Sequence, residues 1–559
     1  MHTLVSILRD HPSLGVFLAL AAGFLLGTRR IGRFSLGTVV CTLLAAVVIG
    51  QSGAKVNVEV RDFFFNLFLF AIGYKVAPQF FGGLRREAIP QFVLATILSG
   101  VALLAAISIG RLLGYDKGTA AGLFAGAMTQ SSAVGSASDA IEVLDATDEV
   151  KRRLLDHLAI GYATTYVFGT AGLAFFLSRI GPRLAGGDLR EACRAQERLL
   201  GGGGDDAPSV QSAYAPLVYL AYVAAHPSVV GRSVAAIEAQ HAGRVTIERL
   251  RRGGATGAIE PATPETVVRA GDIIAVAASR SEVIGPGFDP GEEVDDRALL
   301  DFPLETLDVV VTQKALDGAT IEDVMASHGR GVRIHRLIRT ARRVPLLPKT
   351  TLSRGDMIGV IGARCDVERF ATAVGYPDRH VDSIDMVYVG LGLAAGVLFG
   401  IPSLHVFGIA LGLSAAGALI AGLVFGYLRA RHPTFGRFPS AAEWVFESLG
   451  LHIFVAIVGL NSGPAFVEGL RRDAVSLLFA GAVVTIVPHA VTILCGRWFF
   501  RMNPGVLLGV SAGSGASTAG LIAIEEEAQS TVPVLGYSVT YAVGTVLLTT
   551  CGALMVALG

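Results

Sequence analysis

Charged residues are scarce in this sequence. Asp, Glu, Lys and Arg make up 16% of the 559 residues, hydrophobic residues make up 52%, and the mean hydropathy is +0.57. Soluble proteins contain about 25% charged residues, so this composition excludes an ordinary soluble protein. The charges that are present are concentrated between residues 183 and 385, and both flanks carry apolar runs of about 20 residues, the length that crosses a bilayer. The sequence therefore predicts an integral membrane protein with a soluble block between two membrane blocks.

Several functional signatures are also missing. The formal net charge is zero and no basic block with interleaved aromatic residues occurs, which gives no sign of a nucleic-acid partner. The five cysteines form no CxxC pair, and neither HExxH nor a Walker A sequence is present. We therefore expect no metal, no cofactor and no ATP hydrolysis within the chain.

One short motif is similar to an enzyme signature. Residues 509–513 read GVSAG and fit the G-x-S-x-G nucleophile elbow around Ser511. That elbow needs a strand before the serine and a helix after it, whereas here the motif lies in a membrane segment. We therefore expect that the protein is not an enzyme.

Two segments rich in glycine and serine stand out among the apolar runs. Residues 122–139 read GLFAGAMTQSSAVGSASD, and residues 505–527 read GVLLGVSAGSGASTAGLIAIEEE. Glycine is unfavourable inside a helix and tolerates bends, so each segment predicts a broken helix. Irregular backbone survives in a membrane only where protein or a water-filled cavity surrounds it. We expect each segment to re-enter the membrane as a hairpin, and the two hairpins to form a paired site.

The two membrane blocks repeat the same order of features. Each has five apolar runs with the glycine-serine segment before the last, near residues 13–27, 36–53, 63–77, 89–113 and 157–180, and near residues 386–400, 406–428, 441–460, 474–496 and 532–558. Short matches support the correspondence, namely LAAGFLLG with LAAGVLFG, GLRREA with GLRRDA, and GYATTYVFGT with GYSVTYAVGT. Because five is odd, we expect two inverted repeats, as in many secondary transporters.

Charge placement indicates an orientation. With the N-terminus outside and hairpins that do not cross, the inside loops hold most arginines and Lys75, including Arg29, Arg30 and Arg33 after the first run. The positive-inside rule favours this arrangement, which places both termini outside and the soluble block in the cytoplasm. If both glycine-serine segments crossed fully, each block would have six spans, the repeats would be parallel, and the arginines after the first run would lie outside.

The soluble block contains one unit twice. After a soft linker at residues 181–206, the copies occupy residues 207–290 and 291–383. Each reads as a strand, a helix that starts at glycine, an alternating strand, a turn, and a final apolar strand after Gly-Asp, at Gly271-Asp272 and Gly355-Asp356. No G-x-G-x-x-G opens a helix after a strand, so we expect no nucleotide-binding half. A basic cluster is interpreted as a solvated strand-and-turn face, with an anionic second messenger or lipid headgroup as the alternative ligand; it comprises Arg330, Arg333, Arg336, Arg339, Arg342 and Arg343.

These features carry a family resemblance. The Gly-Asp pairs, with Arg249-Leu250 and Arg336-Leu337 at the ends of the preceding strands, resemble the TrkA C-terminal (TrkA-C) domain in tandem. With membrane repeats at residues 1–180 and 384–559, the whole chain resembles the aspartate:alanine exchanger family of bacterial secondary transporters. The resemblance implies an inner-membrane carrier for acidic amino acids, alanine or related dicarboxylates, and analogy with paired TrkA-C domains implies a homodimer. Many relatives have Thr-x-Thr-Pro in the hairpin segment; this chain lacks that proline, so the substrate stays open.

Hydroxyl and amide groups of the two segments are the candidate substrate ligands. A carboxylate near the membrane midplane must have its hydration replaced, and the sequence shows no arginine inside a span. Backbone amides at broken-helix N-termini, aided by side chains, can serve instead. The predicted substrate-binding residues are Thr129, Gln130, Ser131, Ser132, Ser514, Ser517 and Thr518, then Tyr162, Thr165, Tyr166, Tyr537, Thr540 and Tyr541 on the following helices, and His489. The alternatives are packing roles for the hydroxyls, interfacial belts for the tyrosines, and a hydrogen bond to a neighbouring span for His489.

Together these observations predict an α-helical polytopic membrane protein of two inverted five-helix repeats, each with a re-entrant hairpin, and a cytoplasmic α/β insert of two TrkA-C domains. The predicted function is antiport of small carboxylates or amino acids such as aspartate and alanine by alternating access. The alternatives are a sodium-coupled dicarboxylate carrier and an ion transporter or channel gated by the TrkA-C pair. The expected partners are the substrate, membrane lipid, a second copy of the chain and a regulatory ligand of the TrkA-C domains.

Overall fold

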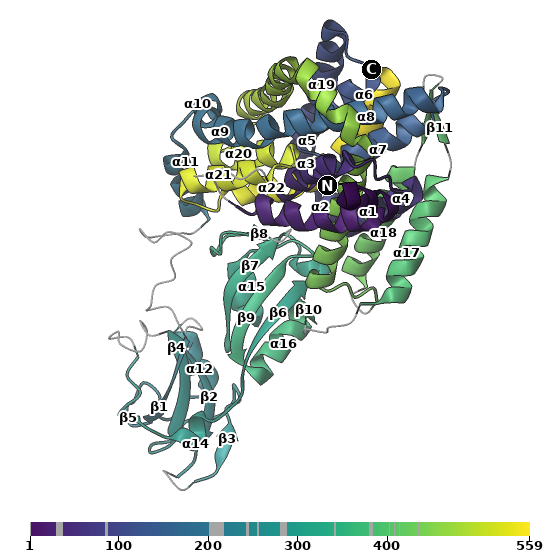
Figure 1. Cartoon of the computed structure of the whole chain (residues 1–559). Helices are drawn as coiled ribbons and strands as arrows, with labels where there is room; N and C mark the ends of the chain where they lie inside the picture. Colours follow the sequence, from purple (N-terminus) through teal and green to yellow (C-terminus); the bar gives the residue numbers. More distant parts are fainter. Residues whose placement is uncertain are drawn as a thin grey trace. The chain divides into compact units, whose positions relative to one another are not determined.

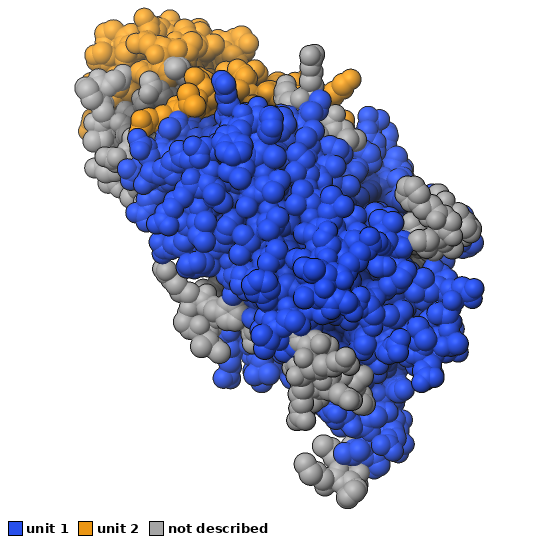
Figure 2. Space-filling view, turned by 90° about the horizontal axis from the view of Figure 1, so that it is seen from above, with its two compact units in different colours: residues 1–196, 380–559 blue, residues 197–379 orange. Residues whose placement is uncertain are grey.

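The computed structural model describes residues 2–29, 37–83, 88–200, 217–241, 245–253, 257–279, 288–339, 342–378, 384–401, 403–406, 409–412, 414–432 and 435–559. The chain divides into two compact units, coloured separately in Figure 2. A helical unit comprises residues 1–196 and 380–559, and a sheet unit comprises residues 197–379. The sheet unit falls within the region where the charges are concentrated.

The helical unit is built from apolar helices (Figure 1). Its elements are α1 (His2–Asp10), α2 (Pro12–Gly27), α3 (Thr38–Gly50), α4 (Val58–Gly83), α5 (Ile89–Leu113), α6 (Lys117–Ala127), α7 (Ser131–Glu142), α8 (Asp148–Val167), η2 (Phe168–Gly172), α9 (Leu173–Phe175), η3 (Phe176–Ile180), α10 (Gly181–Ala185), α11 (Leu189–Leu199), α17 (Met386–Gly400), β11 (Ser403–Val406), β12 (Ile409–Gly412), α18 (Ser414–Arg431), α19 (Ser440–Trp498), α20 (Pro504–Ser514), α21 (Thr518–Ala528) and α22 (Pro533–Leu558).

Six helical stretches among the described residues are long and apolar enough to cross a membrane. They are Val58–Phe81, Ile89–Leu113, Asp148–Ala185, Ala441–Gly463, Ala474–Trp498 and Pro533–Leu558. Three lie in each half of the chain, and the runs at α2, α3 and α17 form shorter apolar helices. A protein with this set of helices is a multi-pass membrane protein.

Three stretches differ from the structure that the sequence predicts. The run at residues 406–428 begins as the antiparallel pair β11 and β12 before α18 starts, because apolar character alone does not separate a strand from a helix. The runs at residues 441–460 and 474–496 correspond to two candidate membrane-crossing stretches, but the loop expected between them is helical, so both belong to α19, which is 59 residues long. The expected soft linker is helical as far as Leu199, since Cys193 of α11 is fully buried and contacts Gly505 of α20.

Corresponding glycines make corresponding contacts in the two halves. A Cβ added to Gly73 of α4 would lie 2.5 Å from the carbonyl oxygen of Leu419 in α18. A Cβ added to Gly459 of α19 would lie 2.8 Å from the carbonyl oxygen of Leu43 in α3. Only glycine permits these approaches, and each contact joins the third apolar run of one half to the second run of the other.

The sheet unit contains two sheets of the same strand order. The first is built from β1 (Leu217–Val223), α12 (Val234–Gln240), β2 (Val245–Arg251), β3 (Ile259–Pro261), β4 (Ile273–Ser279), β5 (Glu293–Val294) and α14 (Arg297–Leu300), and the second from β6 (Leu304–Val311), η4 (Lys314–Leu316), α15 (Ile321–His328), β7 (Val332–Arg339), β8 (Arg342–Arg343), β9 (Met357–Ala363), α16 (Arg364–Val374) and β10 (Gly375–Asp378). The orders are β3-β2-β4-β1-β5 and β8-β7-β9-β6-β10, with all neighbours antiparallel. Figure 1 shows the helices α12 and α15 beside their sheets.

The Gly-Asp pairs precede the strands β4 and β9, as the sequence predicts. Gly271 and Gly355 have φ of 79° and 89°, a left-handed turn conformation that favours glycine. The following aspartates bind arginines from the ends of β2 and β7, with Arg252 Nη1 2.7 Å from Asp272 and Arg339 Nη2 2.6 Å from Asp356. The helices themselves start after the caps Ser233 and Thr320 and not at glycine.

The basic cluster is partly neutralised within the protein. Arg330 Nε lies 2.9 Å from Glu238, Arg336 Nη2 lies 2.6 Å from Asp308, and Arg339 pairs with the fully buried Asp356. The interpretation as a solvated face is therefore wrong for these three arginines. Their carboxylate partners lie 17 to 92 residues away along the chain, which is why the local sequence did not reveal them.

Candidate functional site

The first glycine-serine segment is two helices separated by a break. Between α6 and α7, Thr129 takes a φ of 51°, which is rare for a threonine and ends the helical path. Gln130 then occupies the N-cap position of α7 without a capping hydrogen bond, and its Nε2 donates to Ser132 Oγ at 2.6 Å and to Thr549 Oγ1 of α22 at 3.3 Å. Ser131 Oγ lies 2.7 Å from the hydroxyl of Tyr162 in α8. The side chains of Gln130, Ser131 and Ser132 are therefore buried and bonded to each other or to the long helices α8 and α22.

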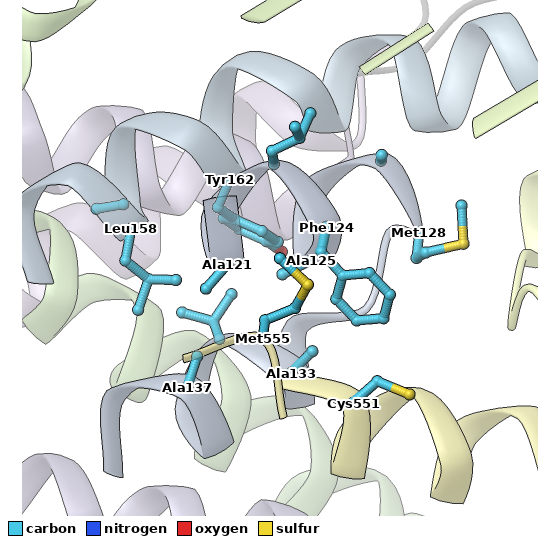
Figure 3. Close-up of a cluster of buried hydrophobic side chains, with 14 of the residues drawn as sticks. Ala121, Phe124, Ala125, Met128, Ala133, Ala137, Leu158, Tyr162, Cys551 and Met555 are labelled. Atoms are coloured by element: carbon cyan, nitrogen blue, oxygen red, sulfur yellow. The ribbon is translucent and has the colours of Figure 1, made fainter. Parts of the chain in front are cut away.

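An apolar shell surrounds the first break. Figure 3 shows Phe124 of α6, Met128 directly after α6, Ala133 of α7 and Met555 of α22 in one buried cluster, with the ring of Tyr162 among them. Small residues on α6 and α7 let the helices approach closely. This packing fixes the positions of the serine side chains that follow the break.

The second segment has the same construction at the aligned positions. Between α20 and α21, Ala516 has a φ of 51°, and Ser517 caps α21 by accepting from the amide of Gly520 at 3.1 Å. Thr518 Oγ1 lies 3.2 Å from the hydroxyl of Tyr537 in α22, the counterpart of the contact between Ser131 and Tyr162. Both segments therefore place a hydroxyl of the second helix against a tyrosine of the next long helix.

The two pairs of short helices cross between the halves of the chain. α6 packs on α8 and α20 packs on α22, each on the next long helix of its own half. In contrast, α7 packs on α22, and α21 packs on the stretch from η2 to η3 of the first half. The second helix of each pair is therefore seated in the opposite half.

The breaks converge on two shared helices. On α22, a Cβ at Gly544 would lie 2.3 Å from the carbonyl oxygen of Ser514, while Thr549, just over one turn further on, binds Gln130 of the first break. On α19, Thr485 Oγ1 donates to the carbonyl of Ala127 at 2.9 Å. One turn later, the imidazole of His489 lies against Gly515 of the second break. Residues far apart in sequence thus surround one buried region.

Several predicted ligands use their hydroxyl groups within their own helix. Ser514 Oγ donates to the carbonyl of Val510, and Thr165 and Thr540 donate to the carbonyls four residues before them at 2.8 and 2.7 Å. These contacts satisfy the hydroxyl protons without a ligand, and each oxygen can still accept a hydrogen bond. Their role as substrate ligands stays a prediction.

The tyrosines do not form an interfacial belt. Tyr162 is 1% exposed and Tyr537 is 2% exposed, so both rings are inside the helical unit. Tyr166 packs edge-on against Tyr162 with ring centroids 5.3 Å apart, and Tyr541 stacks on Tyr537 at 5.2 Å. Each pair adjoins its own break, and the ring of Tyr541 also packs with the end of α4.

Three buried polar atoms on α19, α20 and α22, the helices that form or adjoin the second break, lack partners among the described residues. They are His489 Nε2, Ser511 Oγ and Thr545 Oγ1, in three residues that are at most 1% exposed. Neither ring nitrogen of His489 bonds to a neighbouring span among the described residues, since Nδ1 contacts the Thr485 carbonyl of its own helix at 2.7 Å and Nε2 has no partner. Buried polar groups are nearly always paired in proteins, so three unpaired atoms indicate capacity for a ligand or water.

One set of charged residues was missed by the sequence reasoning. Lys75, expected in a loop, lies within α4, and its Nζ is 2.7 Å from Glu447 and 3.9 Å from Glu443 of α19. All three are in candidate membrane-crossing stretches, where ionisable groups are costly and usually functional. Glu443 and Glu447 stand at i and i+4 in an apolar run, the signal that could have revealed them. Among the described residues no group of three His, Cys, Asp or Glu side chains is placed to hold a metal.

Comparison with known proteins gives a consistent assignment over the whole chain. The family described as Predicted Permease Membrane Region (Asp-Al_Ex) matches residues 15–181 and 388–557, and the TrkA-C domain family matches residues 218–284. An uncharacterized transporter of Shewanella oneidensis is 37% identical over 100% of this chain and 99% of its own length. Uncharacterized transporters of Bordetella parapertussis and Bradyrhizobium diazoefficiens are 35% and 37% identical over 100% of this chain and 98% and 99% of their lengths. No solved structure matches the chain.

Proposed function

The chain belongs to the aspartate-alanine exchanger family of membrane transporters, and from this premise we propose that it is a secondary antiporter for small carboxylates or amino acids. The substrates that the family name suggests are aspartate and alanine, with glutamate and succinate as related candidates. Its relatives are transporters, and we assign no enzymatic activity to the chain.

The observation that carries this proposal is the convergence of the two helix breaks on α19 and α22. Each break presents the N-terminus of a helix, α7 or α21, where backbone amides lack intrahelical acceptors and favour an anionic group. A substrate carboxylate held there exchanges its hydration for these amides and for neighbouring hydroxyl groups. The predicted ligands Thr129, Gln130 and Thr518 lie within two residues of the N-termini of these helices.

The crossed packing supports alternating access. α7 packs on α22 of the second half, and α21 packs on the stretch from η2 to η3 of the first half. Movement of one half therefore displaces the second short helix of the other half. Substrate held between the breaks is then exposed to each side of the membrane in turn. In this proposal the two halves are inverted repeats, and each short helix pair is a re-entrant hairpin.

The orientation and partners are part of the same proposal. We place the protein in the bacterial inner membrane with both termini outside and the TrkA-C domains in the cytoplasm. Arg179 at the end of η3 lies 3.2 Å from Glu527 near the end of α21, and Arg190 of α11 donates to the carbonyl of Glu527. These contacts put the end of α21 beside the stretch that leads into the sheet unit, as a cytoplasmic end requires. A homodimer and a regulatory ligand of the TrkA-C domains complete the proposal.

Counterflow in proteoliposomes tests the function. Vesicles loaded with unlabelled aspartate, alanine, glutamate or succinate should accumulate the labelled compound only when a substrate is inside. Uptake that needs a sodium gradient and no internal substrate would instead identify a sodium-coupled carrier, and single-channel currents would identify a channel. Absence of counterflow for all four compounds contradicts the proposal.

The site is tested separately by cysteine protection in a background without the native cysteines. Thiol reagents should label Ser131→Cys and Thr518→Cys more slowly when a counterflow-active substrate is present. Asp295→Cys, in the sheet unit at a position whose native side chain is 77% exposed, serves as a control that substrate should not protect. Equal labelling of both site cysteines with and without substrate would place the site elsewhere.

A further inference from the structure

Two buried histidines of α19 form a natural comparison. In His452, Nδ1 lies 2.6 Å from the carbonyl oxygen of Ser448, and Nε2 lies 2.8 Å from Thr38 Oγ1. In His489, Nδ1 lies 2.7 Å from the carbonyl oxygen of Thr485, the same contact with the residue four positions earlier. His489 Nε2, however, has no partner among the described residues, although the residue is completely buried.

The contact with the carbonyl fixes the chemistry of the free nitrogen. A carbonyl oxygen can only accept a hydrogen bond, so Nδ1 of His489 carries the hydrogen. In the neutral ring Nε2 then has a lone pair and is an acceptor. A permanently charged imidazole without a partner is disfavoured at this depth, because no solvent reaches it. His489 Nε2 is therefore a buried hydrogen-bond acceptor that has no donor among the described residues.

This acceptor faces the second break. A Cβ added to Gly515 would lie 2.4 Å from Nε2 and 2.9 Å from Cε1 of the ring, so nothing larger than a glycine hydrogen separates them. Immediately after the break, α21 begins with the amides of Thr518 and Ala519, which have no acceptor within the helix, while Ser517 satisfies the amide of Gly520. The second break thus combines unpaired donors on a helix of 11 residues with an unpaired acceptor on α19.

The first break is different. Its Gln130, Ser131 and Ser132 side chains are bonded to Tyr162, Thr549 and one another. In the first half, the GLRR repeat aligns Leu103 with His489. Leu103 is apolar and offers no hydrogen-bond acceptor. The polar side chains of the first break hold the fold, whereas the second break retains an unused donor and acceptor pair.

We propose that the second break binds the zwitterionic end of an amino acid, with its carboxylate on the first amides of α21 and its ammonium group donating to His489 Nε2. This inference rests on the proposed function and adds a selection rule to it. A carboxylate without an amino group leaves the buried Nε2 unpaired and therefore binds more weakly. His489 is the specificity-determining residue, and any side chain at position 515 would cover its Nε2.

Ligand pairs that differ only in the amino group test the proposal. Competition for labelled substrate in counterflow is measured for aspartate against succinate and for alanine against propionate. The full-length wild-type protein should favour the amine-bearing member of each pair by about tenfold or more. His489→Phe should reduce this preference to near unity by weakening aspartate and alanine and leaving succinate and propionate unchanged.

Two further variants separate the role of Nε2 from a structural role. His452→Phe removes the histidine whose Nε2 is already bonded, and it should keep the wild-type preference. Gly515→Ala keeps the imidazole, and its φ of −86° suits alanine, but the added methyl group would lie 2.4 Å from Nε2 and therefore covers or displaces this nitrogen. It should reproduce the loss of preference seen in His489→Phe.

The outcomes are distinct. A wild-type protein without counterflow for any compound overturns the proposed function together with this inference. Wild-type counterflow with no preference for the amine overturns the inference alone. A preference for the amine that survives in His489→Phe or Gly515→Ala also overturns the inference alone. An equal weakening of binding of all four compounds in either variant does the same. Thermal unfolding and size-exclusion profiles of each variant establish that folded protein is compared.

Discussion

A buried carboxyl group in the sheet unit, on β2, is protonated at neutral pH. Loss of this proton should measurably weaken the contact between β2 and α16. Glu248, the bulged residue of β2, is 9% exposed and faces Asp366 of α16, which is 1% exposed. Burial, the hydrogen bond to Asp366 and the charge of Asp366 raise the pKa of Glu248 from 4.5 to about 8. Arg330, Glu238, Tyr219 and Cys365 complete its charged and titratable surroundings. At neutral pH, therefore, Glu248 is protonated.

The sign and size of the effect follow from linkage. Between pH 4.5 and about 8 the folded protein keeps this proton while the unfolded chain loses it, so stability falls as the pH rises through this window and levels off above it. At 1.36 kcal/mol per pH unit the full window amounts to about 5 kcal/mol. Between about pH 6 and 8, local opening of the contact should become up to about 100-fold more frequent.

Hydrogen exchange with mass spectrometry on the full-length protein measures this opening. After correction for the intrinsic exchange rates of the amides, the protection of backbone amides in β2 and α16 of the wild type should decline from pH 6 to pH 8. Glu248→Gln imitates the protonated carboxyl group and should show constant protection. Glu260→Gln, which alters a glutamate of β3 with a side chain 54% exposed, should behave like the wild type. Identical pH profiles for the wild type and Glu248→Gln would refute the reasoning.

Three further predictions concern packing and ion pairs. Arg339→Leu leaves the fully buried Asp356 without its cation and should destabilise the second sheet by about 3–5 kcal/mol in urea unfolding, with recovery in a variant that also carries Asp356→Leu. Lys75→Met should lower the yield of folded protein and its melting temperature because two carboxylates lose their cation, whereas Lys75→Arg should preserve both. Gly122→Val should abolish counterflow and lower the melting temperature, since its Cβ would lie 2.3 Å from a backbone oxygen of α8. Gly100→Val, where nothing lies within 4 Å of the added Cβ, should do neither, and equal effects of the two would contradict the packing argument.

The elements that depend on local chemistry could be predicted from the sequence. Glycine and serine marked the two helix breaks, and the left-handed residues Thr129 and Ala516 occupy aligned positions in the two segments. Gly-Asp marked the starts of β4 and β9, because a left-handed turn and an arginine-binding aspartate are both local requirements. The family resemblance is confirmed over both membrane blocks.

The features that depend on distant partners could not be predicted. The pairing of Lys75 with Glu447 joins residues 372 positions apart, so composition placed the lysine in a loop. The difference between the two breaks is also tertiary, because Gln130 is satisfied by Thr549 of α22 while His489 finds no partner among the described residues. The continuity of α19 could not be predicted either. Charged residues between its two apolar runs indicate a loop in the sequence, whereas the structure is helical there.

The crossed seating of the short helices has a consequence for biosynthesis. Ser132 bonds to Thr549, which the ribosome reaches 417 residues later. At about 5–20 residues per second, the first break waits roughly 20–80 s for its partner helix. During that interval Gln130, Ser132 and Ser136 lack the partners that α22 later provides. The newly made first half should therefore depend on water, lipid headgroups or an insertion factor to shelter these groups, and truncation before α22 should leave it open to degradation.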